Sequence, residues 1–190
     1  MTPRKTTFIT FFAAAAALAG CGGGSALDNA PTIANPAGSS NKKLSFAYFQ
    51  KCIDPIFLAQ LSGGGSTNTC AGSGCHDTVN GTGGALRVIP GATAVDLTNP
   101  TNTADVVRQT DMYKNYYSSQ GVTVIGTPTQ SRLFQKPLLL NVLHGGGQIF
   151  ASQQDPNAML IAYWIEHPLP DEFSPSDGLF DSATGACNTQ

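Results

Sequence analysis

The sequence is poor in charge and has no long run of basic residues. Asp, Glu, Lys and Arg together make up 12% of its 190 residues, and Lys42-Lys43 is the only basic pair beyond the amino terminus. Surfaces that bind nucleic acids need clustered positive charge. Without Arg4 and Lys5, eight basic residues stand against twelve acidic ones, a formal charge of −4. Nothing in this balance indicates a nucleic-acid partner.

The sequence also lacks the residue groupings of common catalytic sites. It offers no combination of Ser, His and Asp typical of nucleophilic catalysis, and no carboxylate pair beside a glycine-rich loop. Only three histidines are present. These absences favour a role in which no substrate is turned over.

No apolar run is long enough to form a mature membrane span. The one at the amino terminus, Phe8–Ala19, is too short to cross a bilayer, and Arg4 and Lys5 precede it. Positive charge followed by a short apolar stretch is typical of an export signal. We therefore interpret residues 1–20 as a signal peptide.

This signal ends in Leu18-Ala19-Gly20-Cys21, which resembles the lipobox of bacterial lipoproteins. The resemblance implies cleavage before Cys21 and acylation of that residue by two or more chains, enough for stable membrane anchoring. Because Gly22 rather than Asp follows, it also implies the outer membrane of the cell envelope, facing either the periplasm or the exterior. The alternative is an ordinary secretory signal with an incidental cysteine.

Residues 22–43 are rich in Gly, Ser, Asn and Pro and nearly free of large apolar side chains. Such a segment buries too little surface to offset the entropy cost of ordering it. We interpret 21–43 as the lipidated cysteine with a flexible tether. Residues 44–190 are then one folded domain.

The most informative motif is Cys70-Ala-Gly-Ser-Gly-Cys75-His76. Two nearby thiols with a histidine directly after the second suit covalent haem attachment, because each thiol can add to one vinyl group and His76 can then bind the iron. The usual spacing is C-x-x-C-H, whereas four residues separate the cysteines here. The small residues between them can loop outward. The chain has one such motif, so we expect one haem c.

The cysteine count supports this assignment without excluding others. With one cysteine assigned to lipid and two to haem, Cys52 and Cys187 remain, and leftover thiols in an exported protein usually pair. One alternative has two disulfides, Cys70–Cys75 and Cys52–Cys187, in a haem-free binding lipoprotein. A zinc site built from Cys52, Cys70, Cys75 and His76 is another.

Apolar periodicity and capping signals predict helices and few strands. The expected helices are residues 44–61 with an interruption at Asp54-Pro55, residues 103–117, one or two turns over 130–136, and residues 155–167. In the second helix, Val106, Tyr113 and Tyr117 are expected on one side. Long glycine-rich loops join these elements. A haem would supply apolar bulk to so thin a core.

Several fragments in order resemble the class I cytochrome c superfamily, and most closely its divergent planctomycete-type branch. The resemblance covers roughly residues 44–168 and implies an all-α fold of small helices around one haem, an electron-carrying function and a protein redox partner. The fragments are Phe49-x-x-Cys52-x-x-Pro55-Ile56-Phe57, Cys75-His76-Asp77, Gly83-Gly84-Ala85-Leu86-Arg87, Ser131-x-Leu133-Phe134-x-Lys136-Pro137-Leu138, His144-Gly145-Gly146-Gly147 and Tyr163-Trp164-Ile165.

The resemblance also implies His144 as the second iron ligand, opposite His76. Its loop has three following glycines that let the backbone approach a flat ring, and related proteins carry the distal methionine near this place. Two histidines would give a lower potential than a His/Met pair. In a peroxidase-like alternative, His144 would be an acid–base residue above an open iron.

Other candidates for the iron or the haem edge are weaker. Met112 and Met159 are expected on outward faces, and His167 is expected on a buried face at a helix end, where it would meet the negative end of the helix dipole. Arg87 and Arg132 are candidate partners of the haem propionates, or else ordinary surface charges.

Overall fold

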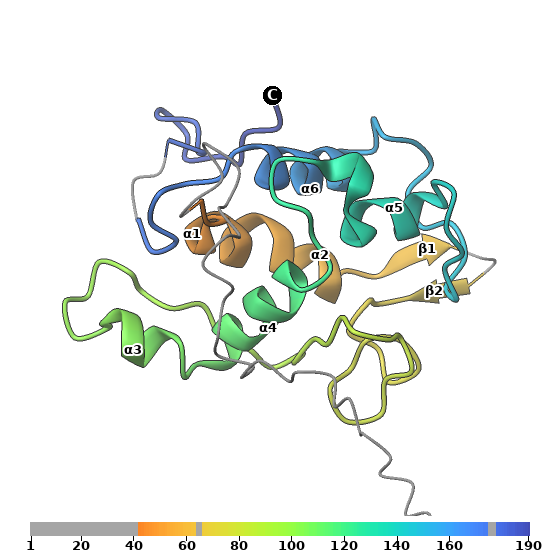
Figure 1. The fold of residues 1–190 in the computed structure, drawn as a ribbon. Coiled ribbons are helices and arrows are strands. Elements are labelled where there is room, and N and C mark those ends of the chain that lie inside the picture. Colours follow the sequence, from red (N-terminus) through yellow and green to blue (C-terminus); the bar gives the residue numbers. More distant parts are fainter. Residues whose placement is uncertain (1–41, 64–65, 175–177) are drawn as a thin grey trace, which may run out of the picture. The chain divides into compact units, whose positions relative to one another are not determined.

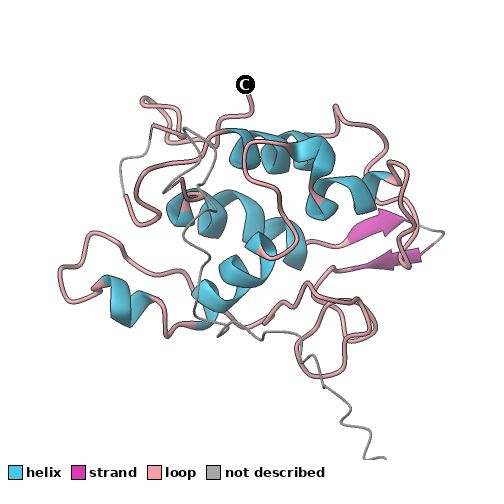
Figure 2. Cartoon of the chain, in the orientation of Figure 1, coloured by secondary structure: helices cyan, strands magenta, loops and turns pink. Residues whose placement is uncertain are grey.

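The computed structural model describes residues 42–63, 66–174 and 178–190. The predicted signal peptide, the predicted lipidation site Cys21 and nearly all of the predicted tether lie outside the described residues. None of the helices within the described ranges is both long and apolar enough to cross a membrane. Figures 1 and 2 show short helices joined by long loops, with one small hairpin.

The first helical segment runs without a gap through α1 (Phe46–Tyr48), the π-helix η1 (Phe49–Ile53) and α2 (Asp54–Leu58). The Ser45 hydroxyl caps it by accepting from the Tyr48 N–H at 2.9 Å. The expected interruption at Asp54-Pro55 is a change of helix type. Pro55 has no N–H and its ring crowds the carbonyl four residues earlier, which favours the wider π turn before it. The segment also ends at Leu58, three residues earlier than predicted.

A two-stranded antiparallel hairpin follows, made of β1 (Leu61–Gly63) and β2 (Ser66–Asn68). Leu61 pairs with Asn68 and Gly63 with Ser66. The sequence did not predict it, because three-residue strands rich in Gly and Ser show no apolar alternation. The hairpin leads from the end of α2 directly into the Cys70–His76 segment.

The predicted helix over 103–117 is two helices, α3 (Ala104–Val107) and α4 (Asp111–Gln120). On the side expected to carry the apolar residues, Val106 and Tyr117 are exposed and Tyr113 is half-buried. The break between the helices shifts the phase of the second one. Its buried side consists of Met112, Asn115, Tyr116 and Ser119. The expectation of an outward Met112 is therefore wrong.

Buried polar side chains on this face are hydrogen-bonded, which explains why a polar pattern conceals an inward side. The Asn115 amide donates to Asp54 Oδ1 at 2.9 Å and to the Ile89 carbonyl at 3.1 Å. Its oxygen accepts from the Ile89 N–H at 2.7 Å. Periodicity of apolar residues cannot detect such a face.

The remaining helices are the short 3₁₀ turn η2 (Pro128–Gln130), α5 (Arg132–Leu138) and α6 (Pro156–Glu166). α5 includes Pro137, which was expected to follow the helix. α6 starts as predicted, with the Asp155 carboxylate accepting from the Asn157 N–H at 2.9 Å and Pro156 in the first turn.

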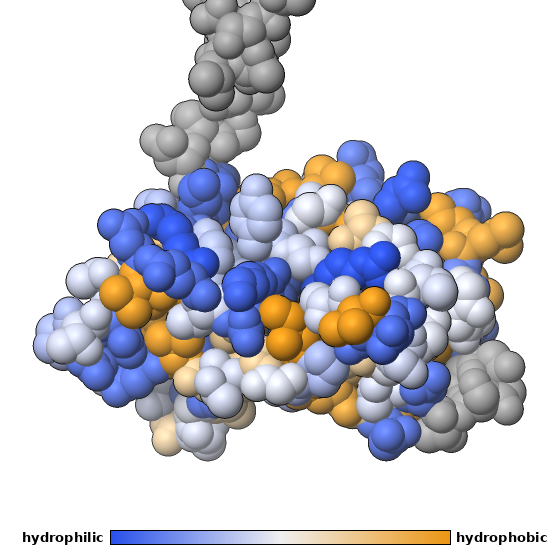
Figure 3. Space-filling view, turned by 90° about the horizontal axis from the view of Figure 1, so that it is seen from below, coloured by the Kyte–Doolittle hydropathy of each residue, from blue (hydrophilic) through white to orange (hydrophobic). Residues whose placement is uncertain are grey.

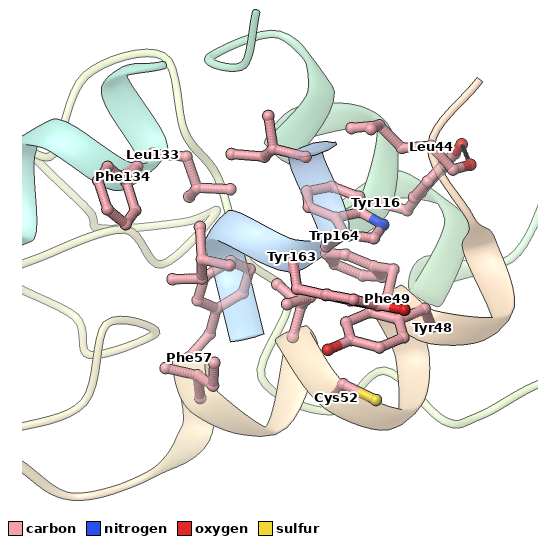
Figure 4. Packing of buried hydrophobic residues seen from close by; sticks show 14 of the residues in the cluster. Leu44, Tyr48, Phe49, Cys52, Phe57, Tyr116, Leu133, Phe134, Tyr163 and Trp164 are labelled. Carbon is pink, nitrogen blue, oxygen red and sulfur yellow. Dashed lines mark hydrogen bonds between the residues drawn. The ribbon is translucent and has the colours of Figure 1, made fainter. Parts of the chain in front are cut away.

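The core lies where α6 packs on the first helical segment, around Trp164, Phe49 and Tyr116 (Figure 4). The Trp164 indole donates to the Ser45 carbonyl at 2.8 Å. Cys52 in η1 and Cys187 in the carboxy-terminal tail form a disulfide, with Cα atoms 6.1 Å apart. This is the pair that the cysteine assignment left over. On the face drawn in Figure 3, apolar residues are scattered among polar ones rather than gathered in one patch.

Candidate functional site

Backbone hydrogen bonds within the Cys70–His76 segment close it into a loop. The Cys75 N–H donates to the Gly72 carbonyl and the His76 N–H to the Cys70 carbonyl, both at 2.9 Å. The Ala71 N–H donates to the Phe57 carbonyl at 3.0 Å, which ties the loop to the last turn of α2. Ser73 and Gly74 are exposed. The two additional residues of the wide cysteine spacing therefore lie in a turn that points outward.

Neighbouring backbone fixes the orientation of the His76 imidazole. Its Nδ1 lies 3.1 Å from the Leu86 carbonyl oxygen. Gly83 packs directly on the ring, since a Cβ there would lie 2.4 Å from Nδ1. Burial lowers the pKa of His76, and the nearby His144, Lys136 and Arg87 add to this. The ring is thus held neutral, the form in which imidazole binds metals.

His144 lies in the loop that follows α5, and this loop has an unusual backbone. Leu139 and Asn141 adopt positive φ values of 54° and 57°, and Gly147 one of 73°. The His144 Nδ1 lies 2.8 Å from the Gly147 carbonyl oxygen. The loop thus bends back on itself. A backbone carbonyl fixes Nδ1 of this second imidazole, as the Leu86 carbonyl fixes Nδ1 of His76.

The structure brings the two histidines together. Their ring centres are 6.3 Å apart and their planes differ by 15°. Two imidazoles that bind one metal from opposite sides, each through a bond of about 2 Å, have ring centres about 6 Å apart. Because each Nδ1 faces a backbone carbonyl, each Nε2 is left as the ligand atom. The pair therefore has the spacing of two axial ligands.

Both histidines line two adjoining hollows, of about 190 Å³ and about 440 Å³. Together they fall within the range of about 300–1,000 Å³ typical of small-molecule sites. We call the hollow of about 190 Å³ the inner hollow and that of about 440 Å³ the outer hollow. The inner hollow is lined mainly by apolar side chains. They are Ile56, Phe57, Leu86, Val122, Leu133, Pro137, Phe150 and Ile161.

The two thiols of the motif lie at this site and are unbridged. Cys70 lines both hollows, while Cys75 lines the outer one. Burial raises the pKa of the Cys70 thiol to about 11. The Asn68 amide lies 3.7 Å from the Cys75 sulfur. The structure thus does not form the Cys70–Cys75 disulfide of the haem-free alternative.

The zinc alternative does not fit the structure either. It needs Cys52, whose sulfur is bonded to Cys187. Among the described residues, no cluster of three or more His, Cys, Asp or Glu side chains is placed to hold a metal ion. Two facing imidazoles beside an apolar hollow suit a metal that brings its own equatorial ligands.

Of the two cations that the sequence indicated, Arg132 lies at the site and Arg87 does not. Arg87 donates to the Gly81 carbonyl at 2.6 Å and does not line either hollow. Arg132 and Lys136, four residues apart on α5, line the inner hollow, and Lys136 also lines the outer one. Sequence reasoning missed Lys136, although its spacing from Arg132 places both on one helix face.

Three further candidates lie away from the hollows. Met112 is buried on the inward side of α4, and Met159 is half-buried on α6. His167 is exposed instead of buried as expected. Its Nδ1 lies 2.8 Å from the Tyr163 carbonyl oxygen and its ring stacks on Tyr163 at 3.9 Å. It interacts with the carboxyl end of α6, as the helix-dipole argument expected.

Comparison of the chain with models of known protein families, with curated proteins and with solved structures finds no match.

Proposed function

We propose that this protein is a monohaem c-type cytochrome that carries electrons in the cell envelope. The observation that carries the proposal is the facing pair of His76 and His144, 6.3 Å apart and nearly parallel, beside two free thiols and an apolar hollow. Cys70 and Cys75 would attach the haem through an expanded C-x₄-C-H motif. The fold is then a variant of the all-α cytochrome c architecture.

Each part of the site has a defined task in this proposal. Haem, when bound, supplies reversible one-electron chemistry at iron. The Leu86 and Gly147 carbonyls lie at Nδ1 of the two imidazoles, so Nε2 of each would be the atom that binds the iron. The apolar lining excludes water, and Arg132 and Lys136 lie where they can pair with carboxylates at the edge of the ring.

The same arrangement favours an electron carrier over an enzyme. If both imidazoles bind the iron, no position on it is left open for a substrate. We further propose that acylation at Cys21 anchors the protein to the outer membrane, as the lipoprotein rule for Gly22 implies, and that a protein partner exchanges electrons with it there.

The test is expression of the full chain in a bacterial host with the machinery for haem attachment. We expect red protein that keeps its haem after denaturing electrophoresis and shows a reduced α-band. Cys70→Ala and Cys75→Ala should each remove one thioether, detected by mass spectrometry of the haem peptide. The matched control is His167→Ala, which removes the one histidine outside the site. Colourless protein from such a host would contradict the proposal.

Addition of cyanide or peroxide separates the carrier from the peroxidase-like alternative. A closed, six-coordinate iron should leave the reduced-minus-oxidised spectrum unchanged at moderate ligand concentration. Rapid binding of cyanide, or turnover of peroxide, would instead identify His144 as an acid–base residue above an open iron.

A further inference from the structure

A chain of aromatic rings runs from the inner hollow to the surface of α4. Trp164 contacts Tyr116, with ring centres 6.2 Å apart, and Tyr116 contacts Tyr113 at 5.4 Å. Tyr113 in turn stacks on Tyr117 at 6.4 Å. Tyr117 is 68% exposed, whereas the other four tyrosines are buried or half-buried. We call Trp164, Tyr116, Tyr113 and Tyr117 the aromatic relay.

The inner end of the relay adjoins the proposed haem site. Phe57 lines the inner hollow and contacts Phe49 at 6.1 Å, and Phe49 contacts Trp164 at 5.5 Å (Figure 4). Ile161, another lining residue, precedes Trp164 by three residues on α6. Phenylalanine is too hard to oxidise to hold a radical itself, but its ring can bridge the short gap between the hollow and Trp164.

A buried carboxylate lies beside the two inner phenols of the relay. Glu172 is buried, and its Oε1 accepts from Arg108 at 2.9 Å. The Tyr116 hydroxyl donates to the Leu44 carbonyl at 2.6 Å and lies 3.4 Å from the other oxygen, Oε2. Burial, and then Glu172, raise the pKa of Tyr116; burial also raises that of Tyr113, where Arg108 opposes and Glu172 adds to the effect.

These features matter because a neutral phenol can be oxidised easily only if a nearby base accepts its proton. In a dry core a lone tyrosine lacks such an acceptor. Glu172 supplies one within reach of Tyr116, and its other oxygen pairs with Arg108. Packing of a core does not require a carboxylate at this place.

We propose that the aromatic relay conducts oxidising equivalents from the haem hollow to the surface at Tyr117, with Glu172 as its internal proton acceptor. This inference rests on the proposed function, because a hydroperoxide in large excess, slowly displacing one imidazole from the otherwise closed iron, would generate those equivalents at the haem. The relay would protect the haem and its thioethers by moving the damage to an exposed, easily re-reduced residue.

The step balances as follows. Reduction of a hydroperoxide to an alcohol and water takes two electrons and two protons. For each electron, Trp164 is oxidised and is restored by Tyr116, which passes its phenolic proton to Glu172. Tyr113 then gives an electron to Tyr116, whose proton returns from Glu172, and the phenolic proton of Tyr113 passes to the vacated carboxylate. Tyr117 in turn gives an electron to Tyr113, whose proton returns from Glu172, and releases its own phenolic proton to solvent. The net result is that one electron passes from Tyr117 to the hydroperoxide and one proton passes from Tyr117 to solvent, which also supplies the protons that the hydroperoxide consumes. A soluble reductant regenerates Tyr117 by returning one electron and one proton.

The first experiment uses the purified full chain and does not depend on haem. Because the chain has a single tryptophan, light at the long-wavelength edge of indole absorption oxidises Trp164 selectively, and an electron scavenger added to the solution takes up the electron that it loses. A nitroso spin trap then captures the radical where it becomes exposed, and mass spectrometry locates the adduct. We expect the adduct on Tyr117, and loss of that adduct in Tyr117→Phe, Tyr113→Phe and Tyr116→Phe.

The matched control is Tyr163→Phe, which removes a buried phenol outside the relay. It should leave the Tyr117 adduct unchanged. Glu172→Gln should reduce the adduct yield while leaving the rings in place. Circular dichroism confirms that each variant is folded, and Tyr113→Phe, whose ring is half-buried, decides the result if Tyr116→Phe fails to fold. An adduct of wild-type yield in Tyr113→Phe and Glu172→Gln overturns the relay.

The second experiment treats the haem-loaded chain with a hydroperoxide in place of light. We expect the same adduct on Tyr117 and faster bleaching of the haem in Tyr117→Phe than in Tyr163→Phe. Colourless protein defeats the proposed function while the light experiment still decides the relay. Red protein without a Tyr117 adduct in either experiment leaves the cytochrome standing and refutes the relay.

Discussion

The imidazoles of His76 and His144 face each other with ring centres 6.3 Å apart and planes only 15° apart, although 67 residues lie between them in sequence. Each is held through Nδ1 by a carbonyl of its own neighbourhood, Leu86 for one and Gly147 for the other. Two loops from different parts of the chain thus place an imidazole each at the same two hollows.

From this pairing we expect His144→Ala to open the iron to added ligands. The variant lacks one axial nitrogen, so cyanide or carbon monoxide should bind and shift the visible spectrum. His144→Met should keep six-coordination and raise the reduction potential, because a thioether favours ferrous iron. His167→Ala is the control and should behave as the parent. An unchanged spectrum and unchanged ligand access in His144→Ala would show that another group occupies the sixth position.

Gly83 should be intolerant of any side chain, for a reason that concerns His76. A Cβ at Gly83 would lie 2.4 Å from the His76 Nδ1 and 2.7 Å from the Cys75 carbonyl oxygen. We expect Gly83→Ala to displace the imidazole and to destabilise the fold by about 1–3 kcal/mol, as overpacking does. Urea unfolding measures the loss, and haem content measures the displacement.

Gly74 provides the matched control, since a Cβ there meets nothing within 4 Å. Gly74→Ala lies in the same loop and should keep both stability and haem. Equal stability and haem content in Gly83→Ala and Gly74→Ala would mean that the close approach at Gly83 has no role in holding His76.

Local signals in the sequence predicted what depends on a few adjacent residues. Asp155 and Pro156 indicated the start of α6, and Cys70 with Cys75-His76 indicated a segment that the structure places at the two hollows. The inward face of α4 could not be found in this way, because Asn115 is buried with hydrogen bonds to the distant Ile89 backbone and Asp54, and Ser119 with one to the Asn115 carbonyl a turn earlier. Burial of a polar residue depends on tertiary partners that periodicity does not contain.

The positively charged side chains near the site show the same limit of prediction from a single sequence. Arg87 follows directly after the loop that packs on His76, yet its guanidinium turns to the Gly81 carbonyl. Lys136 reaches both hollows only because α5 lies against them. Which charge faces a ligand depends on how a helix is rotated in the fold, and a single sequence does not specify that rotation.

The disulfide between Cys52 and Cys187 should contribute to stability through the unfolded state. It closes a loop with a sequence separation of 135 residues, and losing a native bridge of this kind costs about 2–5 kcal/mol. We expect the double variant Cys52→Ser/Cys187→Ser to unfold at lower urea concentration while keeping its haem, because neither residue lines a hollow. Loss of haem in this variant without loss of stability would contradict the separation of the two roles.

Asp54 should give the stability a distinctive pH dependence. Burial raises the pKa of this carboxyl above 3.8, and its hydrogen bond from Asn115 offsets only part of the shift. The folded state therefore binds a proton more tightly than the unfolded state does. The stabilising contribution is complete below pH 3.8 and is lost as the pH rises through the folded pKa. Asp54→Asn, which is neutral throughout, should lack this dependence.

Urea unfolding of the wild type and Asp54→Asn across this pH range measures the effect. The difference between their free energies of unfolding, wild type minus variant, should fall as the pH rises above 3.8 and then become constant. Exposed carboxylates such as Asp96, whose pKa is lowered by hydrogen bonds from Thr98, act in the opposite sense but cancel in the difference. A difference that rises with pH would mean that the Asn115 hydrogen bond outweighs burial, so that Asp54 is held as a carboxylate in the core.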